Sequence, residues 1–528
     1  MFSQNRFLYI LLACIFCVYV RALPLAFALD DIFLIQNNTL LHTDPLRLLL
    51  GDLWAGDETV PQSSFFRPLF LLSVLLDLTV TERPWMFHLQ NIFWHMAATW
   101  MLYQLLIRWL SVSQSLFAAG IFAFHPLQSE VVVWISARND SMAAFFAFSG
   151  LWLYSQKRWS LSKSLLGILC VSSALLSKES TLFLPVMVWV VAPNSKRYRF
   201  LESGFAVGLV LALRRYLEIS VISPAEAHWN LFWDNVYAIV WGDFARIILP
   251  WPMCATRPLA WDSLLPQDWL MGAVILVMTI WLCRDREARV GIIAAILVFL
   301  PTLWPTILNG MHGDRYLYLP MAGLAMAMAK VFPWKKWMIV IFLGWIAVIQ
   351  LRIPNWDGDR ALWSSMYAQK PSSFSAVSLA HIFYNEKRYT EAAVLYQEGY
   401  SAKIPYIAGC SSYIESVFKI TNPQITMEAG EWVLERGCSL SGVMGGVFAV
   451  SLIVDKQWSS AAEMAQISPF DPTKRMDLVR AALAFREGNW LRYMEIRSSW
   501  SSGTSFDQQL QVLMKEDFNV SRLPLQLD

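Results

Sequence analysis

Apolar residues form long runs over the first two thirds of the chain, and short charged loops separate them. The first run, Phe7–Leu29, is long and apolar enough to cross a bilayer as one helix. Residues 30–66 are too polar for a span, and Leu46–Leu53 and Phe65–Leu78 predict helices on the membrane surface. Ten further runs predict spans at roughly His88–Leu110, Ser115–Phe124, Glu130–Tyr154, Leu161–Leu176, Thr181–Val191, Phe200–Leu213, Trp269–Cys283, Ala288–Leu308, Tyr316–Val331 and Lys336–Ile353.

The positively charged loops predict the orientation, because Lys and Arg collect on the cytoplasmic side. We expect the cytoplasmic loops to be those with Arg108 and residues 156–158, 196–199, 284–289 and 334–336. The alternation holds only if Leu231–Leu249 does not cross, which its charged residues Asp234, Asp243 and Arg246 favour. The pattern therefore predicts about eleven crossings, with the N-terminus in the cytoplasm and the C-terminus outside.

From Pro354 the composition changes, and residues 375–403 show apolar positions at helical spacing with a break at Asn385–Lys387. This stretch resembles one tetratricopeptide repeat, and weaker copies follow at about 405–437, 440–470 and 473–502. Such repeats stack into a solenoid that binds peptides or proteins; a non-repeat helical domain is the alternative. The predicted fold is all-α, with a polytopic membrane domain at 1–353, its first external loop at 30–86, and a helical domain at 354–528.

Composition supports a membrane protein, with 56% hydrophobic and only 16% charged residues among 528. The net charge of +2 gives no support for nucleic-acid binding. Among the seven cysteines, Cys14 and Cys17 fall inside the first predicted helix, where we interpret them as packing residues. Cys410 and Cys438 could pair if the C-terminal domain lies in an oxidising compartment.

Two adjacent acids, Asp30 and Asp31, follow the first predicted span on the external side. Neighbouring carboxylates repel, so one of them holds its proton more tightly than a free Asp does. Such a pair suits a base that deprotonates an acceptor hydroxyl, and the alternative is an ordinary helix boundary. Asp52 is a third acid in this loop, and Arg67 opens the second surface helix.

Cations also gather on the external side, where Lys and Arg should be fewest. They are Arg138, Lys178, Arg214, Arg215 and Arg315. Charges at membrane depth are costly and usually functional, and a group of cations on one face suits a phosphate, such as that of a polyprenyl-phosphate lipid. The alternative is that each cation neutralises a neighbouring acid: Arg138 with Asp140, Lys178 with Glu179, and Arg315 with Asp314.

Histidines suggest a metal site only weakly. His88, Asn91 and His95 share one helix face, and His125 and Glu130 begin another external segment. His88 and His95 lack the i, i+4 spacing of a helical zinc pair, so we favour hydrogen-bonded helix packing over metal binding.

Six segments follow one another in the order LDDIFLIQNN (29–38), FFRPLF (65–70), FHLQNIFWH (87–95), HPLQSEVVVWISARNDSMAAFFAF (125–148), LLSKESTLFLP (175–185) and HGDRYLYLP (312–320). In this order they resemble motifs of the transmembrane and tetratricopeptide-repeat O-mannosyltransferase family, and segment 125–148 is the most diagnostic. The resemblance covers most of residues 1–350. The chain departs from the family in its short repeat domain and in residues 223–265.

The resemblance implies a GT-C glycosyltransferase that moves a sugar, mannose in this family, from a polyprenyl phosphate to protein hydroxyls with inversion. Either Asp30 or Asp31 would be the base. Lys178, Arg214, Arg215 and Arg315 would stabilise the departing phosphate. The sugar and acceptor would meet Asp52, Arg67, His88, His125, Glu130, Arg138 and Asp140. The resemblance implies no metal and no cofactor beyond the lipid-linked donor.

Other classes stay open on the sequence alone. A non-enzymatic scaffold with a peptide-binding solenoid explains the repeats but not the charges at membrane depth. A transporter or flippase would show a two-fold repeat of the spans, which we do not find. A polymerase or ligase of lipid-linked glycans shares the donor and differs in acceptor. We expect a multi-pass protein of a bacterial inner membrane, with the endoplasmic reticulum as the alternative.

Overall fold

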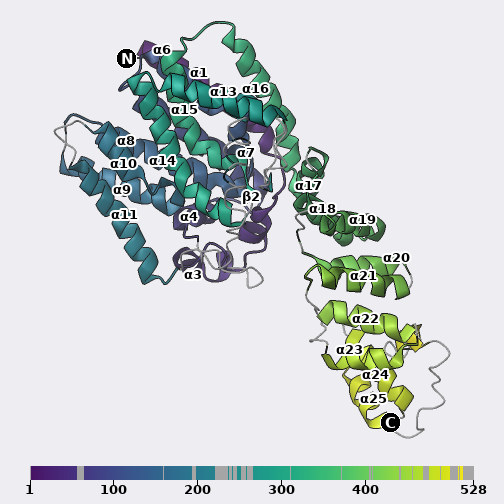
Figure 1. Cartoon of the computed structure of the whole chain (residues 1–528). Helices are drawn as coiled ribbons and strands as arrows, with labels where there is room; N and C mark the ends of the chain where they lie inside the picture. Colours follow the sequence, from purple (N-terminus) through teal and green to yellow (C-terminus); the bar gives the residue numbers. More distant parts are fainter. Residues whose placement is uncertain are drawn as a thin grey trace. The chain divides into compact units, whose positions relative to one another are not determined.

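A computed structural model shows a chain built from helices (Figure 1). It describes residues 2–55, 65–158, 160–192, 198–219, 246–250, 257–258, 266–309, 311–369, 371–402, 408–421, 423–438, 442–454, 456–467, 475–487, 489–499 and 512–514, with a few isolated residues between them. In these ranges the strands are a two-residue antiparallel pair, β1 (Arg257–Pro258) with β2 (Met311–His312). The prediction of an all-α fold is therefore confirmed. The chain divides into two units, Met1–Ser365 and Met366–Asp528.

The first helix is shorter than predicted. Helix α1 spans Phe2–Tyr19 and continues as a 3-10 turn, η1, over Val20–Ala22. The prediction of one helix to Leu29 is wrong over its last turns, because Pro24 has no N–H to donate and disfavours helical backbone in the residue before it. The chain then runs irregularly to η2 (Ile32–Gln36), so Asp30 and Asp31 lie beyond the helix end.

The first loop folds into short helices, as the pattern predicts. After α2 (Leu40–Thr43) comes α3 (Pro45–Leu50), whose first turn is capped by the Asp44 side chain accepting from Arg47 N at 3.1 Å. Helix α4 spans Pro68–Leu78. A buried cluster that includes Leu48, Phe70 and Phe87 joins these helices to the next one, α5 (Pro84–Leu106), and fixes the loop against the helix bundle.

Most of the predicted spans are helices with ends within a few residues of those expected. They are α5 (Pro84–Leu106), α6 (Val112–Phe124), α9 (Leu161–Ser177), α10 (Leu184–Val191), α11 (Arg199–Tyr216), α13 (Pro266–Leu282), α14 (Arg286–Asn309), α15 (Tyr318–Val331) and α16 (Met338–Arg352). Glu130–Tyr154 is broken into α7 (Ser129–Val133), η4 (Ile135–Ala137) and α8 (Arg138–Tyr154), because Trp134 adopts extended backbone. Residues 231–249 lie largely outside the described residues.

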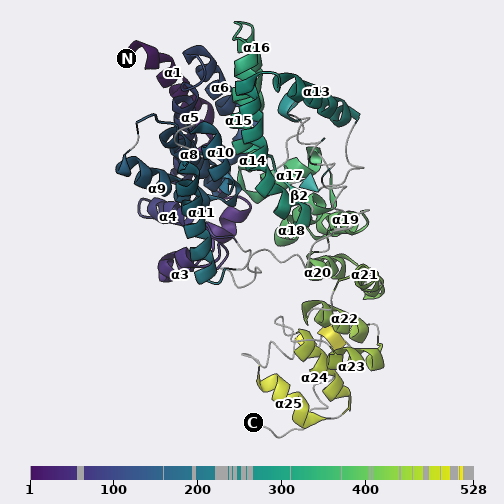
Figure 2. The ribbon, with the colours of Figure 1, turned by 60° about the vertical axis from the view of Figure 1, so that its left-hand side comes forward.

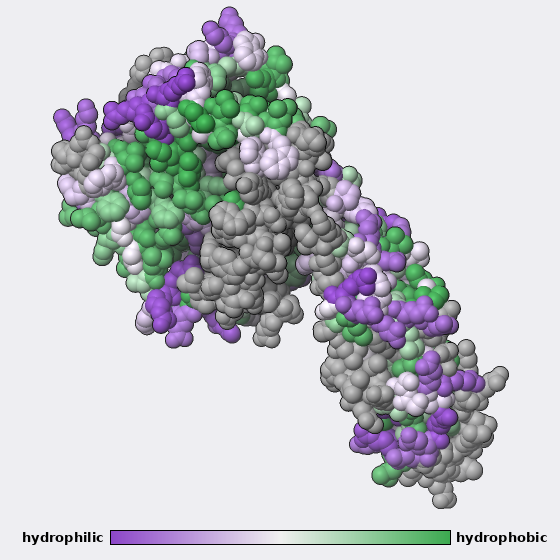
Figure 3. Space-filling view, viewed as in Figure 1, coloured by the Kyte–Doolittle hydropathy of each residue, from purple (hydrophilic) through white to green (hydrophobic). Residues whose placement is uncertain are grey.

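The length and apolarity of the helices allow fewer clear spans than the hydropathy pattern predicts. Within the described residues, Met338–Trp356 is long and apolar enough to cross a membrane, and the pair Val112–Phe124 and Pro126–Val133, bent by 54°, is a second candidate. In the first unit, apolar side chains form a band with hydrophilic residues on both sides of it (Figure 3). The exposed large apolar residues of this unit include Leu165 and Leu169 of α9 and Leu201 and Phe205 of α11.

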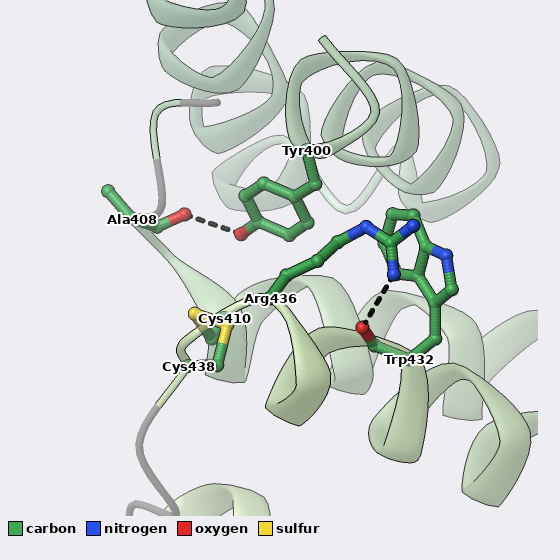
Figure 4. The surroundings of a disulfide bond; sticks show 6 residues. All are labelled: Tyr400, Ala408, Cys410, Trp432, Arg436 and Cys438. Carbon is green, nitrogen blue, oxygen red and sulfur yellow. Dashed lines mark hydrogen bonds between the residues drawn. A yellow bond between two sulfur atoms is a disulfide. The ribbon is translucent and has the colours of Figure 1, made fainter. Parts of the chain in front are cut away.

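The second unit consists of helix pairs at the predicted positions (Figure 2). The pairs are α18 (Ser373–Asn385) with α19 (Tyr389–Tyr400), α20 (Cys410–Ile420) with α21 (Pro423–Glu435), α22 (Gly442–Val454) with α23 (Trp458–Ile467), and α24 (Arg475–Glu487) with α25 (Trp490–Ser498). Helix α17 (Gly358–Gln369) precedes them. Cys410 and Cys438 form a disulfide that ties the start of α20 to the turn after α21 (Figure 4). Beside it, the Arg436 guanidinium lies 3.9 Å from the centre of the Trp432 ring.

Candidate active site

A cavity of about 90 Å³ opens beside the first loop of the first unit. Its charged lining consists of Asp30, Arg67, Asp140, Lys178 and Arg315. Its aromatic lining consists of Trp54, Phe65, Trp134 and Tyr316, and Asn139 adds an amide. A pocket with a few convergent charged groups on an aromatic lining is typical of a ligand-binding site.

The two adjacent acids have different surroundings. Asp30 lines the cavity, and within the described part of the chain its carboxylate has no hydrogen-bond partner. The pKa of Asp30 is raised to about 6, chiefly by burial. Arg315 and Arg67 oppose this rise, and Asp359 adds to it. A carboxylate with this pKa is largely ionised at neutral pH and can still accept a proton, as a general base must.

Asp31 does not line the cavity and holds the backbone. Its Oδ1 accepts hydrogen bonds from Ser136 N at 2.8 Å and from Ser136 Oγ at 2.5 Å, and its Oδ2 accepts from Ala28 N at 3.3 Å. The side chain is 1% exposed. Burial raises the pKa of Asp31 to about 7, and the bonds from Ser136 oppose that rise. We interpret Asp31 as the residue that ties the first loop to η4.

Arg67 enters the cavity from the start of α4 and is oriented by Glu179. Its Nε and Nη2 donate to Glu179 Oε2 at 3.1 and 2.9 Å, and Glu179 Oε1 accepts from Phe66 N at 3.3 Å. Arg214 lies 3.9 Å from the other oxygen of Glu179 and lines a separate apolar crevice with Leu182 and Leu211. A guanidinium has five N–H donors, so Arg67 keeps donors for an anion in the cavity.

Lys178 lies between α9 and the 3-10 turn η5 (Glu179–Thr181), with its ammonium 2.5 Å from the Asp140 carboxylate and 5.4 Å from the centre of the Tyr316 ring. Burial lowers its pKa to about 8; Asp140 opposes that effect, whereas Arg67 and Arg315 add to it. The amine is therefore still mostly protonated at neutral pH.

Arg315 is oriented by a buried network. Its Nη1 donates to Glu130 Oε1 at 2.9 Å, and its guanidinium carbon lies 5.0 Å from the centre of the Trp134 ring. Arg352, from the end of α16, contacts Glu130 at 3.2 Å and Asp314 at 3.0 Å. Arg352 is a residue that the sequence reasoning missed, although a charged residue at the end of an apolar run was a signal for it.

Comparison with known proteins gives this arrangement a context. No protein-family model matches the chain. A protein O-mannosyl-transferase of Caenorhabditis elegans is 24% identical over 420 residues, which cover 72% of this chain and 59% of the relative. Protein O-mannosyl-transferase Tmtc1 of Drosophila melanogaster is 27% identical over 314 residues, 52% of this chain and 35% of the relative. Human protein O-mannosyl-transferase TMTC3 is 26% identical over 144 residues, 26% of this chain and 16% of the relative.

The chain is a distant homologue of these protein O-mannosyl-transferases. The predicted resemblance is confirmed at that level. The chain spans little more than half of the nematode relative and about a third of the fruit-fly one.

The cavity of this O-mannosyl-transferase homologue is lined by residues from five of the six sequence motifs. Segment 29–38 contributes Asp30, segment 65–70 contributes Arg67, and segment 125–148 contributes Asp140. Segments 175–185 and 312–320 contribute Lys178 and Arg315. Motifs that are far apart in the sequence therefore meet at one place.

The ion pairs differ from those expected between sequence neighbours. Among the described ion pairs, Arg138 is not paired with Asp140, two positions away. Lys178 and Arg315 are likewise not paired with their direct neighbours Glu179 and Asp314. The structure instead pairs Arg138 with Asp77, Lys178 with Asp140, and Arg315 with Glu130. Helix and turn geometry directs neighbouring side chains apart and brings distant elements together.

Several predicted site residues in the O-mannosyl-transferase homologue lie away from the cavity. Arg138 is fully buried and holds α4 and α5 through Asp77 at 2.6 Å, Asn91 at 2.7 Å and Ser73 at 3.0 Å. The sixth motif, 87–95, supplies Asn91 to this contact. Arg138 therefore links the start of α8 to α4 and α5 and does not line the cavity.

The remaining predicted residues have structural surroundings. Asp52 accepts from Trp54 N at 2.9 Å in a turn that presents Trp54 to the cavity. His125 is buried, with Nδ1 accepting from Leu127 N and Nε2 3.1 Å from Ile247 O. His88 is buried on α5, and Arg215 is exposed on α11; neither lines the cavity.

The described residues contain no group of three His, Cys, Asp or Glu side chains that could hold a metal ion. His88 and His95 instead lie within the helix bundle, where His95 Nδ1 lies 2.7 Å from the Tyr318 hydroxyl. The independence of metal stays a prediction.

Proposed function

We propose that this chain is a membrane glycosyltransferase that moves mannose from a polyprenyl-phosphate donor to hydroxyl groups of a protein acceptor. The observation that carries the proposal is the meeting of Asp30 with three cations, Arg67, Lys178 and Arg315, on an aromatic-lined cavity. The names of the distant relatives support the choice of mannose and of a protein acceptor.

Asp30 acts as the general base in this proposal. Its carboxylate takes the proton of the acceptor hydroxyl as the hydroxyl oxygen attacks the anomeric carbon of the sugar. The bond from that carbon to the phosphate oxygen breaks, polyprenyl phosphate leaves, and the configuration at the anomeric carbon inverts. Asp31 does not share this role, because its oxygens accept hydrogen bonds from Ser136 and Ala28.

Arg67, Lys178 and Arg315 stabilise the phosphate as negative charge develops on its leaving oxygen. Each is already held in place by a carboxylate: Glu179 for Arg67, Asp140 for Lys178 and Glu130 for Arg315. Preorganised cations need no rearrangement during the reaction. Trp54 and Trp134 offer flat apolar faces on which a pyranose ring stacks.

The proposal includes a polytopic membrane domain of about eleven spans of the GT-C type, with the cavity on the external side. The apolar band of the first unit supports membrane embedding (Figure 3). The Cys410–Cys438 disulfide supports an oxidising compartment for a helical-repeat domain after residue 353. A reporter fused after Asp528 should then be active only outside the cytoplasm, and one inserted at 196–199 only inside.

A transfer assay with the purified full chain tests the function. Radiolabelled polyprenyl-phosphate mannose is supplied with membrane extract as acceptor, and label is counted in protein after proteolysis and in lipid after solvent extraction. The proposal predicts label in protein hydroxyl linkages, released by β-elimination. Label in lipid or polysaccharide alone would indicate a glycan polymerase or ligase, and transfer from a soluble nucleotide sugar would contradict the lipid donor.

A further inference from the structure

The backbone before Asp30 is held by two acids from the end of the first unit. Asp357 Oδ1 accepts from Ala26 N at 3.1 Å, and Asp359 Oδ1 accepts from Leu29 N at 2.6 Å. These acids follow α16 and lie about 330 positions later in the chain. Gly358 between them has φ +78°, a conformation that favours glycine and allows the tight turn.

Leu29 has an unusual conformation for its residue type. Its φ is +57°, in the left-handed region that a non-glycine residue enters at a cost of about 1–2 kcal/mol. Such a conformation persists where the surroundings hold it. The charge-assisted hydrogen bond from Leu29 N to Asp359 is one such contact, since a carboxylate is a strong acceptor for a backbone N–H.

The conformation of Leu29 sets the direction of the next residue. Asp30 follows at once, and its side chain lines the cavity while that of Asp31 turns to Ser136. A return of Leu29 to negative φ would rotate the peptide that enters Asp30. The carboxylate of Asp30 would then leave its position among Arg67 and Arg315.

The same segment supports two other residues of the cavity. Trp356 stacks on Trp134, with ring centres 5.6 Å apart and planes 20° apart. Arg352 holds Glu130, which orients Arg315. The stretch from Arg352 to Asp359 thus contacts the lining residue Trp134 directly. It also contacts Leu29, which precedes Asp30, and Glu130, which orients Arg315.

We propose that Asp359 is a positioning residue, which keeps Leu29 in its left-handed conformation so that the carboxylate of Asp30 faces the cavity. The inference rests on the proposed role of Asp30 as base. Asp359 also carries a charge of the same sign as Asp30. The charged groups near Asp30 are Arg315, Arg67, Asp359 and its neighbour Asp31, and the cavity that Asp30 lines also holds Lys178 and Asp140. Loss of the charge at 359 should therefore favour ionised Asp30.

Three variants of the full chain separate the two effects. Asp359→Ala removes both acceptor and charge, and should lower kcat at least about tenfold with little change in the donor KM, because misplacing a catalytic group slows the chemical step. Asp359→Asn keeps an oxygen for Leu29 N, so it should recover most of that loss. It should also move the acid limb of the kcat/KM profile to lower pH by a few tenths of a unit to about one unit. Asp357→Asn, which touches Ala26 instead, is the matched control and should leave that limb in place.

Wild-type kcat in Asp359→Ala, or an unmoved acid limb in Asp359→Asn, would overturn the inference. If the alanine variant fails to fold, the asparagine variant decides alone. A second readout does not need transfer. The infrared difference spectrum between wild type and Asp30→Asn isolates the carboxyl stretch of Asp30. The pH at the midpoint of the titration of this band should be lower in Asp359→Asn. Absence of transfer by wild type would contradict the proposed function. An unchanged titration midpoint of the Asp30 infrared band would contradict only the role of Asp359.

Discussion

The ammonium of Lys178 lies 2.5 Å from the carboxylate of Asp140, and not against Glu179, its neighbour in sequence. This pair lines the cavity, and so does Asp30. The cavity therefore holds two groups that titrate near neutral pH. Asp30 has a pKa raised to about 6, and Lys178 has one lowered to about 8.

These two groups predict a bell-shaped pH dependence of kcat/KM. Below about pH 6 Asp30 takes up a proton and no longer acts as base, so the rate falls. Above about pH 8 Lys178 loses its proton and its charge on the phosphate, so the rate falls again. Steady-state rates from about pH 5 to about pH 9 measure both limbs. In Lys178→Arg the alkaline limb should disappear, because a guanidinium stays charged; an unchanged alkaline limb would exclude Lys178 as its source.

Much of the architecture follows from the sequence, because apolar runs and turn residues give helices their ends. The helix pairs of the second unit and the break at 385–387 lie where the pattern places them. The end of α1 was misplaced because an apolar run continues through Pro24. A hydropathy profile accepts Pro24 within a span, because it does not take account of the N–H that proline lacks.

The charged residues that line the cavity are among the residues named from the sequence, whereas their contacts are not, and their role in the site stays a prediction. Asp30, Arg67, Asp140, Lys178 and Arg315 were named from charge at membrane depth and from the motifs, and the cavity holds all five. Their partners were not predictable, since Glu130 meets Arg315 across 185 positions and Asp359 meets Leu29 across 330. Long-range pairing depends on how helices pack, which local pattern does not encode.

The phosphate cations should act on donor use. Arg67→Ala and Arg315→Ala remove charge from the cavity and should raise the donor KM or lower kcat about tenfold or more. Arg215→Ala, on the exposed side of α11, is the matched control and should behave as wild type. Initial rates at varied donor concentration distinguish the three. Equal kinetics in all of them would mean that the cations are structural ion pairs.

The Arg138–Asp77 pair should matter for stability. Arg138→Met leaves the Asp77 carboxylate buried without its cation and should destabilise the protein by about 3–5 kcal/mol. The double variant Arg138→Met with Asp77→Leu removes both charges and should recover part of that loss. Thermal unfolding followed by fluorescence measures each. A double variant less stable than Arg138→Met alone would argue against an ion-pair origin.

The disulfide should stabilise the second unit. Cys410→Ala opens a link between residues 28 positions apart and should cost about 3 kcal/mol. Thiol labelling of protein isolated without reductant checks the pairing, since Cys410 and Cys438 should react only after reduction. Labelling of both before reduction, in protein from its native membrane, would contradict an oxidising compartment.

The central claim is that Asp30, and not Asp31, removes the proton of the acceptor. Asp30→Asn is nearly isosteric but takes up no proton at neutral pH, so transfer of mannose from the lipid donor should fall by about a hundredfold or more. Binding of the donor should change little, because the phosphate contacts come from other residues. Asp31→Asn should lower stability through its bonds to Ser136 and Ala28 and should reduce transfer much less.

Single-turnover transfer with saturating polyprenyl-phosphate mannose, measured in parallel for wild type, Asp30→Asn, Asp31→Asn and Asp52→Asn, tests this claim most directly. We predict the large loss in Asp30→Asn alone, with folded protein in each case by its melting curve. A wild-type rate in Asp30→Asn, together with a large loss in a folded Asp31→Asn or Asp52→Asn variant, would contradict it.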